Sequence, residues 1–350
     1  MTRKAIALPL LAALALLLAA ADPAAAQAPG DAGIDAGDST GTGGTRTLCG
    51  DDDRLPAYTG KIGRVIGGSY GGPAGTAYII PNGTLLTAGH VPTDTQYGGG
   101  GRVEFHVPLS SSGGTPEHPA PQYIFYIDQS SIVAYYNSED PVGQDWKIFS
   151  CHPNDETGAL VGSFGCVRLA LVADLPPVDV TVNGYGDDEG VWNNTEQDDT
   201  GPYLGEHIEA ADDVWLEYIV DTMGGSSGSP VLLHGTYVSL GIHTWGGCDP
   251  PDEGNKGTSF TNSALANALA DYFGVPVVYV DAGHLATVED GSIFRPYDTL
   301  TEAVAAAPAG ATINIVSANY SDTPSISTPM TLTAPVGHVY LGLQGARRDE

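Results

Sequence analysis

Residues 224–230 read Gly-Gly-Ser-Ser-Gly-Ser-Pro and lie between two runs, 214–220 and 231–234, that have the composition of β-strands. A Gly/Ser-rich linker has a similar composition, but a disordered linker is not expected between two strands. Glycines around one serine allow the turn that exposes its Oγ and directs backbone N–H groups inward. The pattern singles out Ser227 as a candidate nucleophile.

The strand-like composition extends over residues 58–275. Short runs rich in Val, Ile, Tyr and Thr are separated by clusters of Gly, Pro, Asn and Asp, which is typical of an antiparallel all-β domain, barrel or sandwich. The runs are 75–81, 102–109, 122–136, 164–172, 178–183, 214–220, 229–234 and 237–243. One helical pattern, 263–273, closes the domain.

Two further segments supply groups that a serine nucleophile needs. An apolar strand ends at His90, although a lone histidine at a strand end is more often structural. Asp145 opens the apolar strand 145–149, and a buried carboxylate there would orient an imidazole. Asp140 is the rival acid. We favour Asp145 because it directly adjoins the strand that would fix its position.

The chain order His90, Asp145, Ser227 resembles that of the chymotrypsin-like proteases. The segments around His90 and Ser227 are similar to the family's Thr-Ala-Xaa-His and Gly-Xaa-Ser-Gly-Xaa-Pro signatures, and residues 180–186 resemble the strand that opens its second barrel. The form Gly-Ser-Ser-Gly-Ser-Pro, with Gly-Ile-His following at 241–243, is most similar to the bacterial glutamyl endopeptidase branch.

This resemblance implies two six-stranded antiparallel β-barrels followed by a C-terminal helix, with the site in the cleft between the barrels. His90 and Asp145 would come from the first barrel and Ser227 from the second. Ser227 would attack a peptide carbonyl, His90 would take its proton, and the N–H groups of Gly225 and Ser227 would bind the oxyanion. Such an enzyme acts on polypeptides and needs no cofactor or metal.

The substrate pocket leaves three alternatives open. His243 stands where it could hydrogen-bond a substrate glutamate, as in the glutamyl branch. Asp221, with Thr222 beside it, matches the spacing of the pocket-floor acid of trypsin-like enzymes, which select Arg or Lys. His243 and Asp221 could also pair with each other. The resemblance favours glutamate, and Thr244 and Trp245 are expected at the pocket rim.

Arg64-Val65-Ile66-Gly67-Gly68 looks like the activation site of trypsin-type zymogens. In those enzymes the new N-terminus pairs with an Asp just before the nucleophile, but here that position is Ser226. We therefore interpret residues 65–66 as part of the first strand.

The N-terminus predicts export. A basic start, an apolar run over residues 5–21 and Ala-Ala-Ala at 24–26 predict a signal peptide, residues 1–26, in preference to a membrane anchor. No stable membrane insertion is expected after its removal, and the protein would be secreted or extracytoplasmic. Residues 27–57 are rich in Gly, Asp and Ala and predict a flexible leader or propeptide. The net charge of −29 disfavours binding to nucleic acid.

Four cysteines in an exported chain predict disulfides. The pairing Cys151–Cys166 is favoured because the two flank a turn-rich stretch, which leaves Cys49–Cys248. A zinc site at Cys151, His152 and Cys166 is the less favoured alternative because it lacks a second closely spaced pair.

Residues 276–350 form a separate module, with strands expected at 277–281, 311–317 and 329–333 and a helix at 298–307. The pattern resembles the opening coil of right-handed parallel β-helix proteins, with one or two coils present.

The alternatives for the whole chain are a catalytically inactive homologue that acts in binding or surface adhesion, and an esterase on the same fold. Calcium at the acidic stretches 187–189 or 198–199 is disfavoured against solvated loops.

Overall fold

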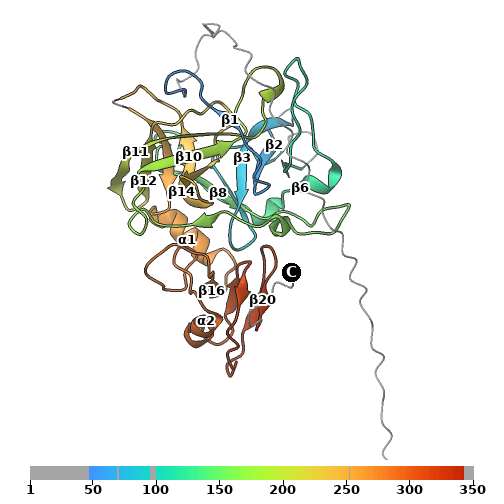
Figure 1. Ribbon diagram of the computed structural model, residues 1–350, viewed down its shortest axis with the longest axis vertical. Coiled ribbons are helices and arrows are strands. Elements are labelled where there is room, and N and C mark those ends of the chain that lie inside the picture. Colours follow the sequence, from blue (N-terminus) through green and yellow to red (C-terminus); the bar gives the residue numbers. More distant parts are fainter. Residues whose placement is uncertain (1–46, 69–70, 95–99, 252, 343–350) are drawn as a thin grey trace, which may run out of the picture. The chain divides into compact units, whose positions relative to one another are not determined.

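The computed structural model describes residues 47–68, 71–94, 100–251 and 253–342 of the 350-residue chain. The predicted signal peptide, 1–26, and residues 27–46 of the predicted leader lie outside this range. β-Strands make up most of the regular structure, and Figure 1 shows them in two curled antiparallel sheets followed by a helix and a smaller C-terminal module.

The first barrel follows the sheet order β6-β5-β2-β3-β4-β8-β7. Its strands are β2 (Ile62–Gly67), β3 (Gly72–Ile79), β4 (Leu85–Thr87), β5 (Arg102–Glu104), β6 (Ile124–Tyr126), β7 (Val133–Tyr136) and β8 (Asp145–Phe149). Strands β6 and β7 are two parts of one interrupted segment, and Ile127 between them bridges Cys151 just beyond β8. The sheet therefore closes into a barrel with six strand positions.

The second barrel is a ring in which each strand pairs with two others, in the order β10-β11-β12-β15-β14-β13 and back to β10. Its strands are β10 (Asp179–Gly184), β11 (Gln197–Ala210), β12 (Asp213–Tyr218), β13 (Pro230–Leu233), β14 (Val238–Trp245) and β15 (Asn255–Ser259). Two short strands add to this ring, namely β1 (Leu55–Pro56) on β11 and β9 (Arg168–Leu169) on β14. The predicted pair of six-stranded antiparallel barrels is confirmed.

The helices are short. α1 (Ser263–Asp271) begins at Asn262, whose side chain accepts a hydrogen bond from the Leu265 N–H and donates to the Gly143 and Asp212 carbonyls. It buries Leu265 and Leu269 and closes the domain as predicted. The 3₁₀ helices in the described residues are η1 (Pro121–Tyr123), η2 (Gln129–Ser131), η3 (Val161–Phe164) and η4 (Gly190–Trp192).

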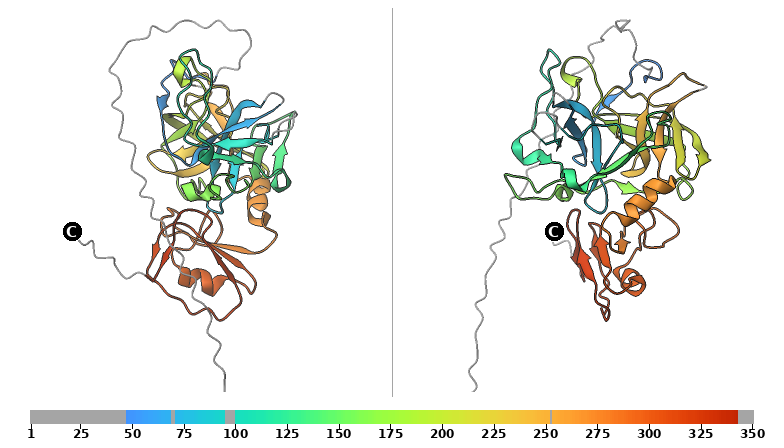
Figure 2. Two further views of the ribbon diagram at one scale, coloured as in Figure 1. Left: turned by 90° about the vertical axis from the view of Figure 1, so that its right-hand side faces the viewer. Right: turned by 180° about the vertical axis from the view of Figure 1, so that it is seen from behind.

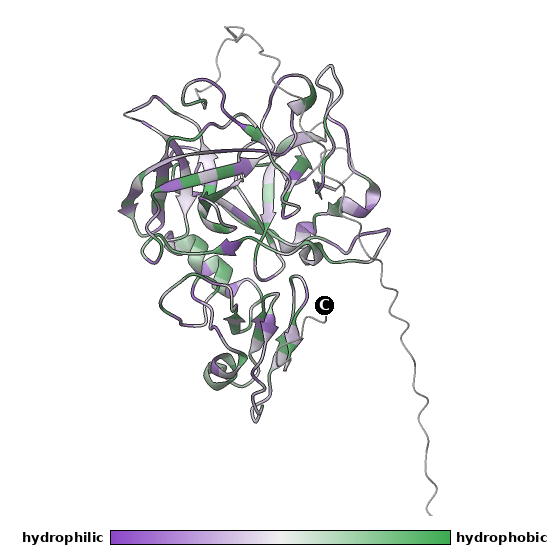
Figure 3. Cartoon of the chain, in the orientation of Figure 1, coloured by the Kyte–Doolittle hydropathy of each residue, from purple (hydrophilic) through white to green (hydrophobic). Residues whose placement is uncertain are grey.

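Hydrophobic side chains fill the barrels because apolar residues either alternate with polar ones along a strand or follow one another without interruption. The largest described cluster joins first-barrel residues such as Tyr78, Phe105 and Phe149 to Leu265 of α1, and a second lies inside the second barrel around Val182 and Tyr218. Figure 3 shows hydrophobic residues along the strands and α1, interspersed with hydrophilic ones. The loops that carry polar side chains are therefore supported by packed barrels.

The C-terminal module pairs its strands in parallel. β16 (Val277–Val280), β17 (Thr312–Ile315) and β19 (Thr331–Thr333) form one sheet, and β18 (Asn319–Tyr320) with β20 (Tyr340–Leu341) forms another. Helix α2 (Leu300–Ala306) connects β16 to β17 and packs Leu300 and Ala303 on them, in the region drawn in red in both views of Figure 2. These elements lie where the sequence predicts strands and a helix. The kinship to β-helix proteins stays a prediction.

Two partly buried ion pairs join this module to the preceding domain. Arg168 of β9 donates to both oxygens of Asp281, at 2.6 and 3.0 Å, and Arg295 does the same to Asp174, at 2.7 and 2.9 Å. Bidentate pairs of this kind fix orientation as well as distance.

Residues 47–57 differ from the expected flexible leader. The disulfide Cys49–Cys248, which the sequence predicts, joins this segment to the loop after β14. β1 then adds to β11, and the Cys49 and Asp53 N–H groups donate to the Asp221 carboxylate, at 2.6 and 2.8 Å. This part of the chain is therefore folded onto the second barrel.

The predicted bond Cys151–Cys166 is wrong, because both thiols are free. Each is held by its own surroundings: Cys151 is in the bridge with Ile127, and Cys166 packs in the large hydrophobic cluster. Burial raises the pKa of both thiols, that of Cys166 to about 12. Closeness in sequence across a turn does not supply the Cα geometry that a disulfide requires.

Within the described residues no helix has both the length and the apolar composition that a membrane span requires.

Arg64 and Val65 lie inside β2 and are fully buried, so the zymogen-like sequence forms part of the first strand.

Candidate active site

His90 and Asp145 are brought together by the pairing of β4 with β8. Thr87 lies opposite Lys147 in this antiparallel pair, so the residues after β4 lie beside the first residue of β8. A Cβ atom added to Gly89 would lie 2.9 Å from Oδ1 of Asp145. Glycine at position 89 therefore allows the backbone before His90 to approach the carboxylate.

Both carboxylate oxygens of Asp145 contact His90. Nδ1 lies 2.5 Å from Oδ2, and the backbone N–H of His90 donates to Oδ1 at 2.9 Å. Because a carboxylate only accepts, Nδ1 carries the hydrogen of this contact, and in the neutral imidazole Nε2 then keeps its lone pair. The Asp145 side chain is 1% exposed, the His90 side chain is 33% exposed, and the Thr258 hydroxyl donates to the Asp145 carbonyl. The rival Asp140 is exposed to solvent.

The loop around Ser227 is shaped by two glycines with positive φ. Gly225 has a φ of 94° and Gly228 a φ of 91°, and a Cβ on either would clash with backbone oxygen, at 2.5 and 2.1 Å. Within the described part of the chain, neither the Gly225 N–H nor the Ser227 N–H donates a hydrogen bond. Two unpaired N–H groups beside a serine are the donors that an oxyanion site needs.

Ser227, His90 and Asp145 line the same pocket, which has a volume of about 230 Å³. The described contacts include no hydrogen bond between the Ser227 hydroxyl and His90. Such bonds are often long in unliganded sites and tighten when substrate binds. The structure thus brings the three residues to one pocket, with the His90–Asp145 pair already formed.

Thr76 of β3 holds the serine loop in place, a role that the sequence analysis missed. Its N–H donates to the Ser227 carbonyl and its hydroxyl to the Gly225 carbonyl, both at 2.9 Å. The same hydroxyl oxygen accepts from the Tyr185 N–H at 2.9 Å. A first-barrel side chain therefore positions a second-barrel loop. No local sequence signal marks a threonine in mid-strand for this role.

His243, Thr244 and Trp245 line the pocket, as the sequence predicts. His243 is buried, and its Nδ1 lies 2.7 Å from the Tyr218 hydroxyl. Burial, with a smaller contribution from the nearby His90, lowers the pKa of His243 to about 3. The imidazole is therefore neutral at neutral pH.

Asp221 and Thr222 do not line this pocket, contrary to the sequence prediction. The Asp221 carboxylate is occupied by two backbone N–H groups of the segment 49–53, and burial raises its pKa. The Thr222 N–H donates to the carbonyl of Thr47. This segment covers Asp221, so a spacing taken from trypsin-like enzymes places the acid wrongly. Thr47 itself lines the pocket instead.

The acidic stretches 187–189 and 198–199 do not contribute to a metal-binding group among the described residues. Asp187 accepts from Asn194, and Asp188 accepts from Gln197. The described group of at least three potential ligands is His284, Glu289 and Asp298 in the C-terminal module, which does not include the cysteines of the alternative zinc site.

No family model matches the chain, and no curated protein is similar to it. Among solved structures it is similar to a Glu endopeptidase in complex with MPD, at 19% identity and a TM-score of 0.44, over 63% of this chain and 96% of that one. It is also similar to HL collagenase, at 15% identity and a TM-score of 0.43, over 64% of this chain and 98% of the other. The fold is chymotrypsin-like, as the two closed barrels show. The chemistry of the chain is inferred below from its own side chains.

Proposed function

We propose that this chain is a secreted serine endopeptidase with Ser227 as nucleophile, His90 as general base and Asp145 as the orienting acid. The observation that best supports this proposal is the His90–Asp145 pair. Both carboxylate oxygens of Asp145 are bound by His90, in the pocket that Ser227 also lines. A histidine held in this way presents Nε2 as the proton acceptor.

The reaction follows from these positions. Ser227 Oγ attacks the scissile carbonyl carbon as His90 Nε2 takes its proton, and the Gly225 and Ser227 N–H groups bind the resulting oxyanion. His90 then protonates the leaving amine, and an acyl-enzyme remains. Water, deprotonated by His90, attacks the ester and releases Ser227.

We also propose that the pocket prefers glutamate before the scissile bond. With the Tyr218 hydroxyl donating to Nδ1 of His243, Nε2 carries a hydrogen that a neutral imidazole can donate to a carboxylate. Asp221, which would attract Arg or Lys, is covered by the segment 49–53. Matched peptides with Glu, Gln or Arg at this position test the preference, and equal hydrolysis of the Glu and Gln peptides would refute it.

The domain limits belong to the same proposal: a signal peptide 1–26, a leader that ends before the folded residues at 47, a protease domain to 275 and the C-terminal module 276–350. Export agrees with the disulfide Cys49–Cys248, since such bonds persist in oxidising compartments. Polypeptides are the proposed substrates.

Labelling with a fluorophosphonate tests the nucleophile. We expect one label per wild-type chain, no label on Ser227→Ala, and a loss of turnover of about a million-fold in that variant. Ser229→Ala is the matched control, because the Ser229 hydroxyl is buried and has no hydrogen-bond partner among the described residues. An unlabelled wild type would favour the alternative of an inactive binding homologue. Labelling that survives in Ser227→Ala would place the nucleophile elsewhere.

A further inference from the structure

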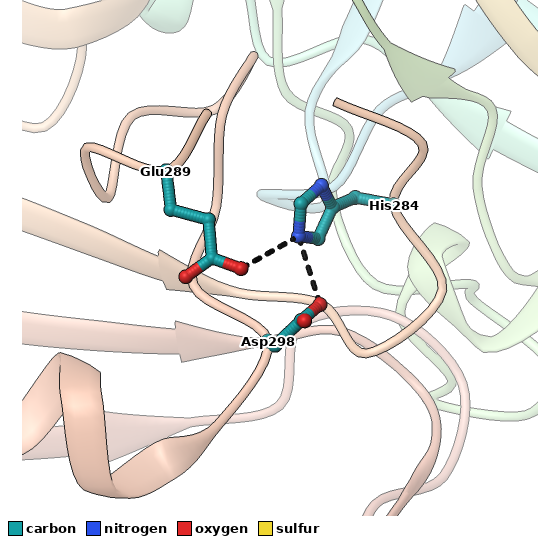
Figure 4. Close-up of side chains that lie close together, drawn as sticks. All are labelled: His284, Glu289 and Asp298. Atoms are coloured by element: carbon teal, nitrogen blue, oxygen red, sulfur yellow. Dashed lines mark ion pairs between the residues drawn. The ribbon is translucent and has the colours of Figure 1, made fainter. Parts of the chain in front are cut away.

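Three ligand-bearing side chains meet in the C-terminal module, well apart in sequence from the proposed catalytic residues. His284, Glu289 and Asp298 place one nitrogen and two carboxylate oxygens within 4.8 Å of one another. His284 Nε2 lies 2.9 Å from Oδ1 of Asp298 and 3.4 Å from Oε1 of Glu289. Figure 4 shows the imidazole pointing between the two carboxylates.

The imidazole of His284 is buried without a hydrogen-bond partner. Its side chain is 7% exposed, and within the described residues neither ring nitrogen makes a hydrogen bond. The two carboxylate oxygens approach Nε2 without meeting hydrogen-bond geometry. The two nearby carboxylate oxygens therefore replace only part of the lost hydration of the imidazole, so an additional group that binds Nε2 would stabilise it.

The backbone holds two of the three residues in place. The His284 N–H donates to the Asp281 carbonyl, and the Asp281 carboxylate accepts from Arg168 and from the Gly283 N–H. Asp298 directly follows Tyr297, whose N–H and C=O both bond to the backbone of β16 and the residue after it. The potential ligands are therefore positioned by the sheet and by an ion pair, not only by flexible loops.

We propose that His284, Glu289 and Asp298 bind a divalent transition-metal ion, with Zn²⁺ as the best fit. One imidazole nitrogen and two carboxylate oxygens suit Zn²⁺, and the imidazole disfavours Ca²⁺ and Mg²⁺, which prefer oxygen ligands. Asp298 is 58% exposed, so water can fill a fourth position. The ion would neutralise the two carboxylates.

Such an ion would connect the loop after β16 with Asp298, two residues before α2 begins, and so stabilise the module.

Calorimetric titration of the full-length, untagged secreted chain with Zn²⁺ tests the proposal. We expect one ion per chain and a higher melting temperature for the Zn²⁺-loaded protein. Asp298→Asn and Glu289→Gln should each weaken binding by about tenfold or more. Both sites are partly exposed, so these variants should fold, and circular dichroism checks that they do.

Asp290→Asn is the matched control. Asp290 is a neighbouring acid outside the cluster, and asparagine keeps the acceptor that the Ser292 N–H uses. Its Zn²⁺ affinity should equal that of the wild type. Absence of binding to the wild type, equal weakening in the control, or Ca²⁺ binding as tight as that of Zn²⁺ would each overturn the proposal. If Zn²⁺ bound to the pair His207–Glu217 instead, binding would persist in Asp298→Asn. That result would also overturn the proposal.

Discussion

The two barrels bury their titratable side chains in different ways. The first barrel buries carboxylates beside nitrogen partners: Arg64 and Glu104 are both fully buried with 2.7 Å between Nη2 and Oε2, and Asp145 is bound by His90. In the second barrel, burial shifts the pKa values toward the uncharged forms. Burial lowers the pKa of His243 to about 3 and raises that of Glu196 to about 7. The proposed proton transfer thus uses a histidine bound to a buried carboxylate, and the proposed substrate recognition uses a histidine that burial keeps uncharged.

The difference matters because a buried charge polarises its neighbours strongly, whereas a neutral donor binds a carboxylate without needing a counter-ion of its own. A base that must become an imidazolium requires the first arrangement. A pocket that must discriminate a carboxylate from an amide can use the second. Substitutions that remove one charge or one hydroxyl test whether the two barrels divide the work in this way.

The largest effect on turnover among these substitutions is expected for Asp145→Asn. The amide is isosteric but cannot hold Nδ1 as a donor and stabilise the imidazolium, so kcat should fall by about 10,000-fold. Steady-state kinetics on a Glu peptide measures it, with Asp140→Asn as the control because Asp140 is exposed. A comparable loss in the control, or a small loss in Asp145→Asn, would contradict the assignment of the acid.

Sequence motifs singled out the proposed catalytic residues because the chemistry requires particular residue types close to strand ends. Residues 85–91 and 224–230 each carry a local signal. The strand pattern predicted the all-β class and α1, and the family resemblance implied the two barrels. The pocket was predicted less well. Asp221 had the right spacing, but a long-range contact with residues 49–53 covers its carboxylate.

Contacts between distant segments account for the other failures. Thr76 positions the Ser227 loop through two hydrogen bonds and accepts a third from the Tyr185 N–H, and a mid-strand threonine is not distinguishable by its neighbours in sequence. The disulfide Cys151–Cys166 failed because pairing depends on Cα positions that spacing does not give. The cluster around His284 combines ligands from separate turns without a recognisable motif.

The charged pair of the first barrel should dominate its stability. Glu104→Gln leaves the Arg64 guanidinium buried without a counter-ion, which should lower the free energy of unfolding by about 3–5 kcal/mol. In the wild type, burial alone would raise the pKa of Glu104, but Arg64 holds it below its ordinary value.

Urea unfolding measures the difference in unfolding free energy that Glu104→Gln causes. It is carried out in the Ser227→Ala background to avoid autolysis. The control is Glu253→Gln, which removes an exposed pair with Lys256 and should leave the midpoint unchanged. If Glu104→Gln unfolds at the wild-type midpoint, then the first barrel does not depend on its buried charges.

The raised pKa of Glu196, in the second barrel, predicts that the stability of the fold depends on pH. Its folded pKa of about 7 lies above the ordinary value of 4.5, so the folded protein binds the proton more tightly. The resulting stabilisation, on the order of 3 kcal/mol, is complete below pH 4.5 and is lost as the pH rises through 7. Glu196→Gln cannot titrate, and should remove this part of the pH dependence.

The measurement compares unfolding free energies of wild type and variant between pH 5 and 8, again in the Ser227→Ala background. The wild type should lose stability relative to Glu196→Gln as the pH rises. Glu189→Gln, an exposed acid nearby, should follow the wild-type curve. Parallel curves for wild type and Glu196→Gln would mean that Glu196 is charged in the folded protein.

The smallest effect concerns the tautomer of His243. Tyr218→Phe removes the hydroxyl at 2.7 Å from Nδ1, so the hydrogen on Nε2 is no longer fixed. The preference for Glu over Gln peptides in kcat/KM should fall by about tenfold, with little change in kcat for the Gln peptide. Tyr203→Phe is the matched control, because the described residues offer the buried Tyr203 hydroxyl no hydrogen-bond partner. An unchanged Glu/Gln ratio in Tyr218→Phe would show that another group binds the substrate carboxylate. The contrast between the two barrels would then not extend to substrate recognition.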